Sequence, residues 1–318
     1  MRAITMYVLL YIAADLTTTN MGMVGGQHVE KQCFKSSEPM PVILMSSGRS
    51  GSSAIWQLMC EAAQMARRGS AEDLAGHERR ACGGREQFSA TKQFGNASNI
   101  AAQKAFSARL SPSDNGKWAV KELRRLQMEH PGAPLVGFKW KPYLLEPSFF
   151  ASALAKIARC HSPTIKVVRN RRNALDVVLS NEKHVANQQL APHCDASDQP
   201  CLQLAARAST GIMIHADTLL EKMREKTRHN DYVDTLLREV GISHVNLDYD
   251  RLFYSDRSDE EWKKLLHFLG MDPSLVTLDE VQKSVGMAPT NPHNHTISIG
   301  NYGAVRDVLM GTEFESLL

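Results

Sequence analysis

The feature that most constrains the fold is a short apolar segment that runs straight into a glycine-serine turn and then a helical pattern. Residues 41–46 (PVILMS) are almost continuously apolar, which is typical of a strand buried on both faces of a parallel sheet. Residues 46–53 (SSGRSGSS) follow, and the apolar spacing over residues 54–66 predicts an amphipathic helix. A strand, a turn and a helix in this order form the first part of a right-handed crossover between parallel strands.

Three further segments have the composition of buried strands, and helical patterns alternate with them. The strand-like segments are residues 135–142, 164–169 and 244–249. The helical patterns lie near residues 99–110, over 146–159, from residue 173, over 202–240 and through most of the C-terminal third. Because strands alternate with helices, we expect an α/β fold: a P-loop-like parallel sheet of about four to five strands flanked by helices, with a helix-rich C-terminal part.

The N-terminal residues differ in composition from the rest of the chain. Residues 3–14 are apolar apart from Thr5, which fits the apolar core of a signal peptide and falls short of the ~20 residues of a spanning helix. We expect a signal or anchor and a linker over residues 1–40, able to associate with a membrane, and one folded domain over residues 41–318. This arrangement favours the secretory pathway or Golgi, whereas a core-packed or unstructured N-terminus would favour the cytoplasm.

The composition argues against two classes of protein. The 37 basic and 34 acidic residues leave a net charge of +3, far below the basic excess of a duplex nucleic-acid binder, although a small anion needs only a few well-placed cations. Six cysteines are too few for a disulfide-built fold of 318 residues. Cys194 and Cys201 are close enough in sequence to form a local disulfide, and free thiols fit the sequence equally well.

The glycine-serine turn has the chemistry of a phosphate cradle. Glycines let the backbone curl around an anion, and the helix that follows adds N–H donors and a favourable dipole. Nucleotide kinases end this loop with Gly-Lys-[Ser/Thr], whereas here Ser52 stands where their lysine would be, which argues against a magnesium-dependent NTPase. The candidate ligands are Ser47, Gly48, Arg49, Ser50, Gly51, Ser52 and Ser53.

A second polar motif follows the third strand-like segment. Residues 172–180 (RNALDVVLS) begin just after that strand and continue into a helix. Arg172 and Ser180 are spaced so that both can reach one phosphate group. The apolar residues Leu175 and Val178 would fit an ordinary amphipathic helix as well.

Together the two motifs resemble those of the PAPS-dependent sulfotransferases. Residues 47–53 are similar to the 5′-phosphosulfate loop of that family, and residues 172–180 are similar to its 3′-phosphate motif, Arg-Asn-Pro-x-Asp-x-x-x-Ser. Gly48 and Ala174 replace the prolines that are usual in the two motifs. Residues 301–314 are similar to the C-terminal ends of a group of algal sulfotransferase-like proteins.

The resemblance implies an enzyme that moves a sulfuryl group from PAPS to a hydroxyl or amine and releases PAP, without a metal. The glycine-serine turn would hold the 5′-phosphosulfate, and Arg172 and Ser180 would hold the 3′-phosphate. Tyr249 resembles a family residue that lies near the adenine. The acceptor would be a small molecule or a carbohydrate, which the sequence does not identify.

Sulfuryl transfer also needs groups that stabilise charge and accept a proton. Lys139 and Arg49 are the candidates for stabilising the transferring group. Lys141 stands where cytosolic sulfotransferases have a histidine base, and a lysine pKa near 10.4 would have to fall by about 3 for this role at neutral pH. The hypothesis is therefore that Lys141 joins Lys139 in stabilising the transition state and that Glu86 or His184 accepts the proton, with Glu61 as a further carboxylate in reach of the same role.

Two other functions fit part of the pattern. A P-loop ATP-dependent kinase or NTPase shares the strand, turn and helix, and a non-catalytic PAP-binding relative would keep the fold without the reaction. Residues 67–98 and 185–200 have no clear period, so we expect loops there that shape the acceptor site.

Overall fold

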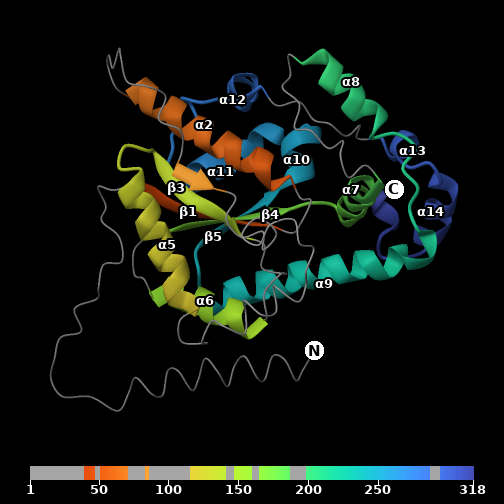
Figure 1. The fold of residues 1–318 in the computed structure, drawn as a ribbon, viewed down its shortest axis with the longest axis horizontal. Helices are drawn as coiled ribbons and strands as arrows, with labels where there is room; N and C mark the ends of the chain where they lie inside the picture. The colour runs from red at the N-terminus through yellow and green to blue at the C-terminus, as the bar shows by residue number, and fades with distance from the viewer. Residues whose placement is uncertain are drawn as a thin grey trace.

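The centre of the molecule is a five-stranded parallel sheet (Figure 1). The computed structural model describes residues 39–46, 51–70, 83–85, 115–140, 147–159, 165–186, 198–286 and 294–318. The strands pair in the order β2-β3-β1-β4-β5, and every pair is parallel. They are β1 (Met40–Ser46), β2 (Gly83–Arg85), β3 (Leu135–Trp140), β4 (Lys166–Arg171) and β5 (His244–Asp248). The expected α/β fold with four to five parallel strands is confirmed.

Helices cover both faces of this sheet (Figure 1). One face packs against α2 (Ser52–Ser70), α10 (Tyr249–Tyr254), α11 (Ser258–Leu269) and α12 (Leu278–Val285). The other face packs against α5 (Asn115–Glu129), α6 (Pro147–Arg159) and α9 (Ala216–Val240). The remaining elements are α7 (Ala174–Ala186), α8 (Gln199–Arg207), α13 (His295–Ser298), α14 (Tyr302–Leu309) and a 3-10 turn, Glu315–Leu317. The part of the chain described after β5 is therefore helix-rich, as expected.

Burial on both faces explains the continuous apolar run of β1. Ile43 and Met45 pack on the face covered by α5, α6 and α9, whereas Val42 and Leu44 pack on the face covered by α2 and α11. All four side chains are fully buried. Because successive residues of a strand point to opposite faces, a central parallel strand needs apolar residues at every position.

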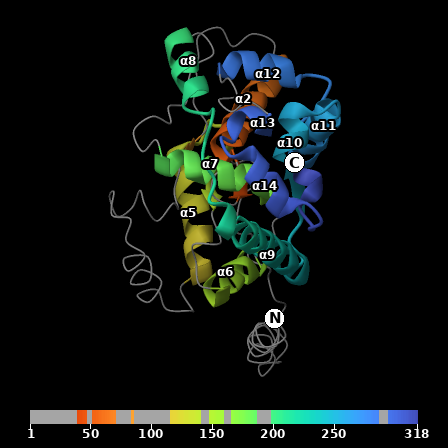
Figure 2. The same ribbon diagram turned by 90° about the vertical axis from the view of Figure 1, so that its right-hand side faces the viewer.

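A third apolar cluster lies beside the sheet and fixes α7. Its buried residues come from α7, the first half of α9 and the C-terminal helix α14. Figure 2 shows α7 next to α13 and α14, on the side of the molecule where the chain ends. The C-terminal residues 294–318 are thus part of the packing that holds the second polar motif.

The helical pattern over residues 202–240 is interrupted in the structure. Residues 208–215 separate α8 from α9, and Ile212 pairs there with Ile299 in an isolated parallel bridge. Gly211 has φ 66°, a conformation that turns the chain and that other residues rarely adopt. The expectation of one continuous helix is wrong because this turn docks onto the C-terminal segment.

Two regular elements have no clear sequence signal. β2 is a short glycine-rich edge strand inside the stretch 67–98, where a loop was expected, and α2 extends to Ser70. The three residues of β2, Gly-Gly-Arg, have no apolar pattern. The sequence patterns also did not predict α5, which places apolar residues such as Leu123 and Leu126 in the core.

Some expectations concern residues outside the described part of the chain. They include residues 1–38, the helix near 99–110 and Cys194. Cys201, at the start of α8, is disulfide-bonded. Within the described ranges, no helix has both the length and the apolar character that crossing a membrane requires.

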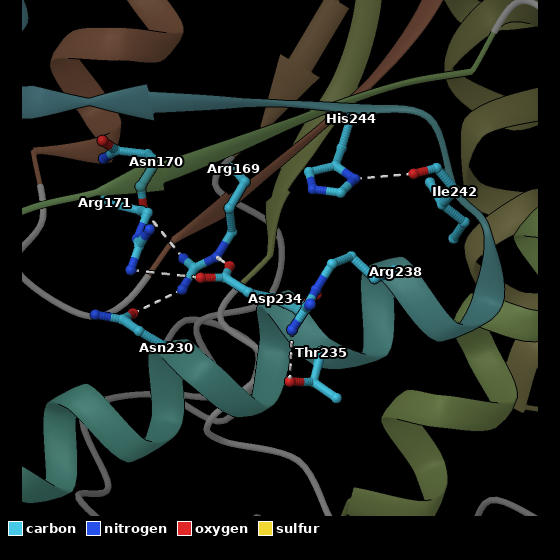
Figure 3. A network of polar contacts seen from close by, with 9 residues as sticks. All are labelled: Arg169, Asn170, Arg171, Asn230, Asp234, Thr235, Arg238, Ile242 and His244. Carbon is cyan, nitrogen blue, oxygen red and sulfur yellow. Dashed lines mark hydrogen bonds and ion pairs between the residues drawn. The ribbon is translucent and has the colours of Figure 1, made fainter. Parts of the chain in front are cut away.

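A buried arginine joins α9 to the centre of the sheet (Figure 3). Arg169 on β4 is 1% exposed; its Nε donates to Asp234 Oδ1 at 2.9 Å and its Nη2 donates to Asn230 Oδ1 at 2.6 Å. Burial lowers the pKa of Arg169, and the charge of Asp234 opposes this shift. Arg171 adds a longer ion pair to Asp234, at 3.6 Å. The network satisfies a charge that the core could not otherwise accept.

We predict that Asp234→Ala destabilises the fold by about 3–5 kcal/mol, because it leaves the buried Arg169 guanidinium without its carboxylate. Urea denaturation followed by circular dichroism measures the effect. The double variant Arg169→Met/Asp234→Leu should recover most of the loss, since it removes both charges. Asp279→Ala, which breaks an exposed ion pair with Lys283, is the control and should leave the midpoint unchanged. Equal stability of Asp234→Ala and the wild type would contradict the claim that Asp234 is needed to neutralise the buried Arg169.

Candidate functional site

The two polar motifs lie at the carboxyl ends of neighbouring strands. The glycine-serine turn follows β1, and Arg172 follows β4, which is the direct neighbour of β1. The chain after β1 continues to β2 at one edge of the sheet, whereas the chain after β4 continues to β5 at the other edge. Strands whose connections leave in opposite directions form a topological switch point, where α/β proteins commonly bind ligands.

Gly51, the residue before α2, lies against the first residue after β5, Tyr249. Its φ is 76°, and an added Cβ would lie 2.0 Å from Cε2 of the Tyr249 ring. Only a residue without a side chain fits this position without a shift of the ring. Tyr249, at the start of α10, is 9% exposed and belongs to the core cluster below α2.

Arg172 contacts the same tyrosine from the other motif. Its guanidinium carbon lies 4.7 Å from the centroid of the Tyr249 ring, a cation–π contact, and its side chain is 7% exposed. Its Nε lies 3.8 Å from Oδ1 of Asp250, whose Oδ2 accepts the backbone N–H of Asn173 at 2.8 Å. The corner after β5 therefore holds the start of the second motif.

Burial governs the titration of the groups around Arg172. Burial raises the pKa of Asp250, the Asn173 N–H opposes this, Asp176 raises it further and Arg172 lowers it. Burial also raises the pKa of Tyr249 and Tyr254, so both hydroxyls stay neutral at physiological pH. Burial therefore works against ionisation of Asp250, the carboxyl beside Arg172.

The helix that follows Arg172 is buried around its first turns. Residues 174–179 are all buried, including Asp176 at 7% exposure. Oδ1 of Asp176 lies 3.1 Å from Nε2 of His295 in α13. Further along, Nζ of Lys183 donates to Oγ of Ser209. The C-terminal segment and the turn after α8 thus cover the polar side chains of α7.

Lys139 connects β3 to the start of α2. Its side chain points to the α2 face of the sheet, and its Nζ donates to Oγ of Ser53 at 3.0 Å. Lys139 is 6% exposed, so this ammonium is held in place rather than solvated. Ser46, at the end of β1, is fully buried, and its Oγ has no hydrogen-bond partner among the described residues. The ammonium of Lys139 therefore lies at the end of the glycine-serine segment, and the hydroxyl of Ser46 lies at its beginning.

The structure describes part of the predicted site. It brings Gly51 and Arg172 together at Tyr249. It also places Ser52 and Ser53 at the start of α2, where Lys139 of β3 donates to Ser53. Ser180 is half-buried on α7, and His184 is exposed near the end of the same helix. The predicted site residues outside the described part of the chain are Ser47, Gly48, Arg49, Ser50, Glu86 and Lys141.

Sequence reasoning missed several residues of this region. Asp176 and Asp250 lie beside predicted residues, but only the fold shows that they share one buried region with Arg172. His295 and Lys183 had no motif that linked them to it. Comparison with known proteins adds no assignment, because no family model and no curated protein matches the chain.

We predict that Gly51→Ala lowers the stability of the fold by more than the strain of its backbone angle explains. Gly270 has the same φ of 76° with no atom near an added Cβ, so Gly270→Ala measures the backbone cost, about 1–2 kcal/mol. Gly51→Ala should cost clearly more, because its Cβ meets the Tyr249 ring. Thermal denaturation of both variants tests this. In the Tyr249→Ala background the excess cost of Gly51→Ala should disappear; if it persists, the ring is not the obstacle.

Proposed function

We propose that the protein is a sulfotransferase that moves a sulfuryl group from PAPS to a hydroxyl or amine acceptor and releases PAP. The observation that carries the proposal is the meeting of the two motifs: Gly51 from the first and Arg172 from the second contact one aromatic ring, Tyr249. A nucleotide with phosphates on both sides of its ribose needs two anion-binding groups that face one another around a base. This arrangement supports such a ligand.

The residues present fit the donor on each of its parts. The turn that ends at Gly51, the N-terminus of α2 and the unpartnered Ser46 hydroxyl would hold the 5′-phosphosulfate. Arg172 and Ser180 would hold the 3′-phosphate. Tyr249, already stacked against Arg172, would lie near the adenine. The site thus offers a cation and hydroxyls to each anionic part.

Lys139 is the residue best placed to stabilise the reacting group. When bound, the donor supplies a sulfuryl group whose bond to the 5′-phosphate oxygen breaks as the acceptor oxygen or nitrogen bonds to sulfur. The Lys139 ammonium, fixed by Ser53, would neutralise the charge that builds up on the leaving oxygen. Lys141 would assist Lys139, and Glu86 or His184 would take the proton of the acceptor.

A kinase or NTPase is less well supported by the same site. Such enzymes hold the β- and γ-phosphates with a lysine of the loop, where this chain has Ser52. Arg172, which follows the neighbouring strand β4, has no counterpart in that arrangement. A PAP-binding relative without activity shares the donor site and differs only in the transfer step, which the experiments below address.

We predict that PAP, without added metal, raises the thermal midpoint more than ADP does at equal concentration, because only PAP carries a 3′-phosphate for Arg172 and Ser180. Ser180→Ala should lower the shift given by PAP and leave the shift given by ADP nearly unchanged. The outcome against the proposal is a larger shift with ADP that depends on Mg²⁺, which would favour a kinase or NTPase.

We predict that Lys139→Met lowers turnover at saturating PAPS by roughly 100-fold, the loss typical of one transition-state donor. Labelled PAPS, first screened against cell extract with products identified by mass, supplies the acceptor for this assay. Lys283→Met, which removes an exposed lysine of α12, is the matched control. Near-normal turnover of the Lys139 variant would remove it from the mechanism. PAP binding without transfer to any acceptor in the extract would favour the inactive relative.

A further inference from the structure

The helix α7 carries a polar stripe that continues past the residues assigned to the donor. Asp176, Ser180 and Lys183 are four and three residues apart, so they lie along one face of the helix. This face begins one turn after Arg172. Lys183 is 8% exposed, although it lies near the C-terminal end of α7, where His184 and Val185 are exposed. A lysine is rarely buried to this extent unless its ammonium has a polar partner.

Ser209 orients the Lys183 ammonium. The Lys183 Nζ donates to Ser209 Oγ, and the Ser209 hydroxyl donates to the carbonyl of Ala205 at 2.5 Å. Because the single hydrogen of the hydroxyl goes to Ala205, the oxygen is left to accept from Lys183. Ser209 is 3% exposed, so neither group moves freely. The ammonium of Lys183 is therefore held in a fixed position one turn beyond Ser180 on the same helix.

Lys183 and Arg172 bring two positive charges into the same buried region. Burial lowers the pKa of Lys183, and the nearby charge of Arg172 lowers it further. Two cations that repel one another away from water would both be stabilised by a dianion bound beside them. Ser180 lies on the helix face between them and adds a hydroxyl donor.

We propose that Lys183 is a third ligand of the donor's 3′-phosphate, beside Arg172 and Ser180, and that Ser209 is the positioning residue that aims it. This inference rests on the proposed function, because the 3′-phosphate is what distinguishes that donor. It adds to the site a residue that lies outside both sequence motifs.

The test compares the affinities of PAP and 5′-AMP, which differ by the 3′-phosphate alone. Isothermal titration calorimetry of the full chain should show that Lys183→Met weakens PAP binding by at least about tenfold, the cost of one hydrogen bond to a charged group. The affinity for 5′-AMP should stay within about twofold. Ser209→Ala should weaken PAP binding by less and in the same selective way.

The thermal midpoint of the unliganded variant separates binding from folding. Methionine fills a similar volume without a buried charge, so Lys183→Met should fold with a midpoint equal to or above that of the wild type. Lys222→Met is the matched control: it removes a lysine of α9 that pairs with Glu182 of α7, and it should leave both affinities unchanged.

Two other results would contradict either the role of Lys183 or the proposed function itself. If Lys183→Met binds PAP as the wild type does, or loses PAP and 5′-AMP equally, Lys183 is no ligand of the 3′-phosphate, while the proposed function stands. If the wild type itself shows no preference for PAP over 5′-AMP, the proposed function fails and this inference fails with it.

Discussion

The ring of Tyr249 contacts both Gly51, the residue before α2, and the guanidinium of Arg172, so it joins residues that follow β1, β4 and β5. The contact needs a glycine at position 51, because a Cβ there would overlap the ring. It also needs the corner after β5, where Asp250 accepts the N–H of Asn173 and so fixes the first residues of the second motif. The order of the strands creates the switch point, and the contacts of Tyr249 bring Gly51 and Arg172 to the same place there. The candidate donor site depends on both.

Arg169 of β4 and Arg172, just after this strand, have different surroundings. Arg169 points to the α9 face, and its guanidinium is matched by Asp234 and Asn230 at short distances (Figure 3). Arg172 lies over an aromatic ring, with Asp250 at 3.8 Å. An arginine held by short bonds to acid and amide groups serves the core. Arg172 instead contacts an aromatic ring and a more distant carboxylate, at the end of the strand where the two motifs meet.

The sequence predicted the elements whose residues carry a strong local pattern. β1, the turn and α2 were recognised because a strand buried on both faces is continuously apolar, and Arg172 and Gly51 were recognised because they belong to motifs. β2 escaped because three residues at a sheet edge need no apolar pattern. The break at Gly211 escaped because it depends on a pairing with Ile299, far along the chain. Lys183 escaped for the same reason: only the packing of Ser209 shows that it is buried and aimed.

The most direct test of the account is a crystal structure with PAP bound. The account predicts the 3′-phosphate beside Arg172 and Ser180, the 5′-phosphate at the turn that ends at Gly51, and the adenine near Tyr249. PAP bound elsewhere on the molecule, or bound with its 3′-phosphate remote from Arg172, would contradict the claim that the two motifs form one donor site.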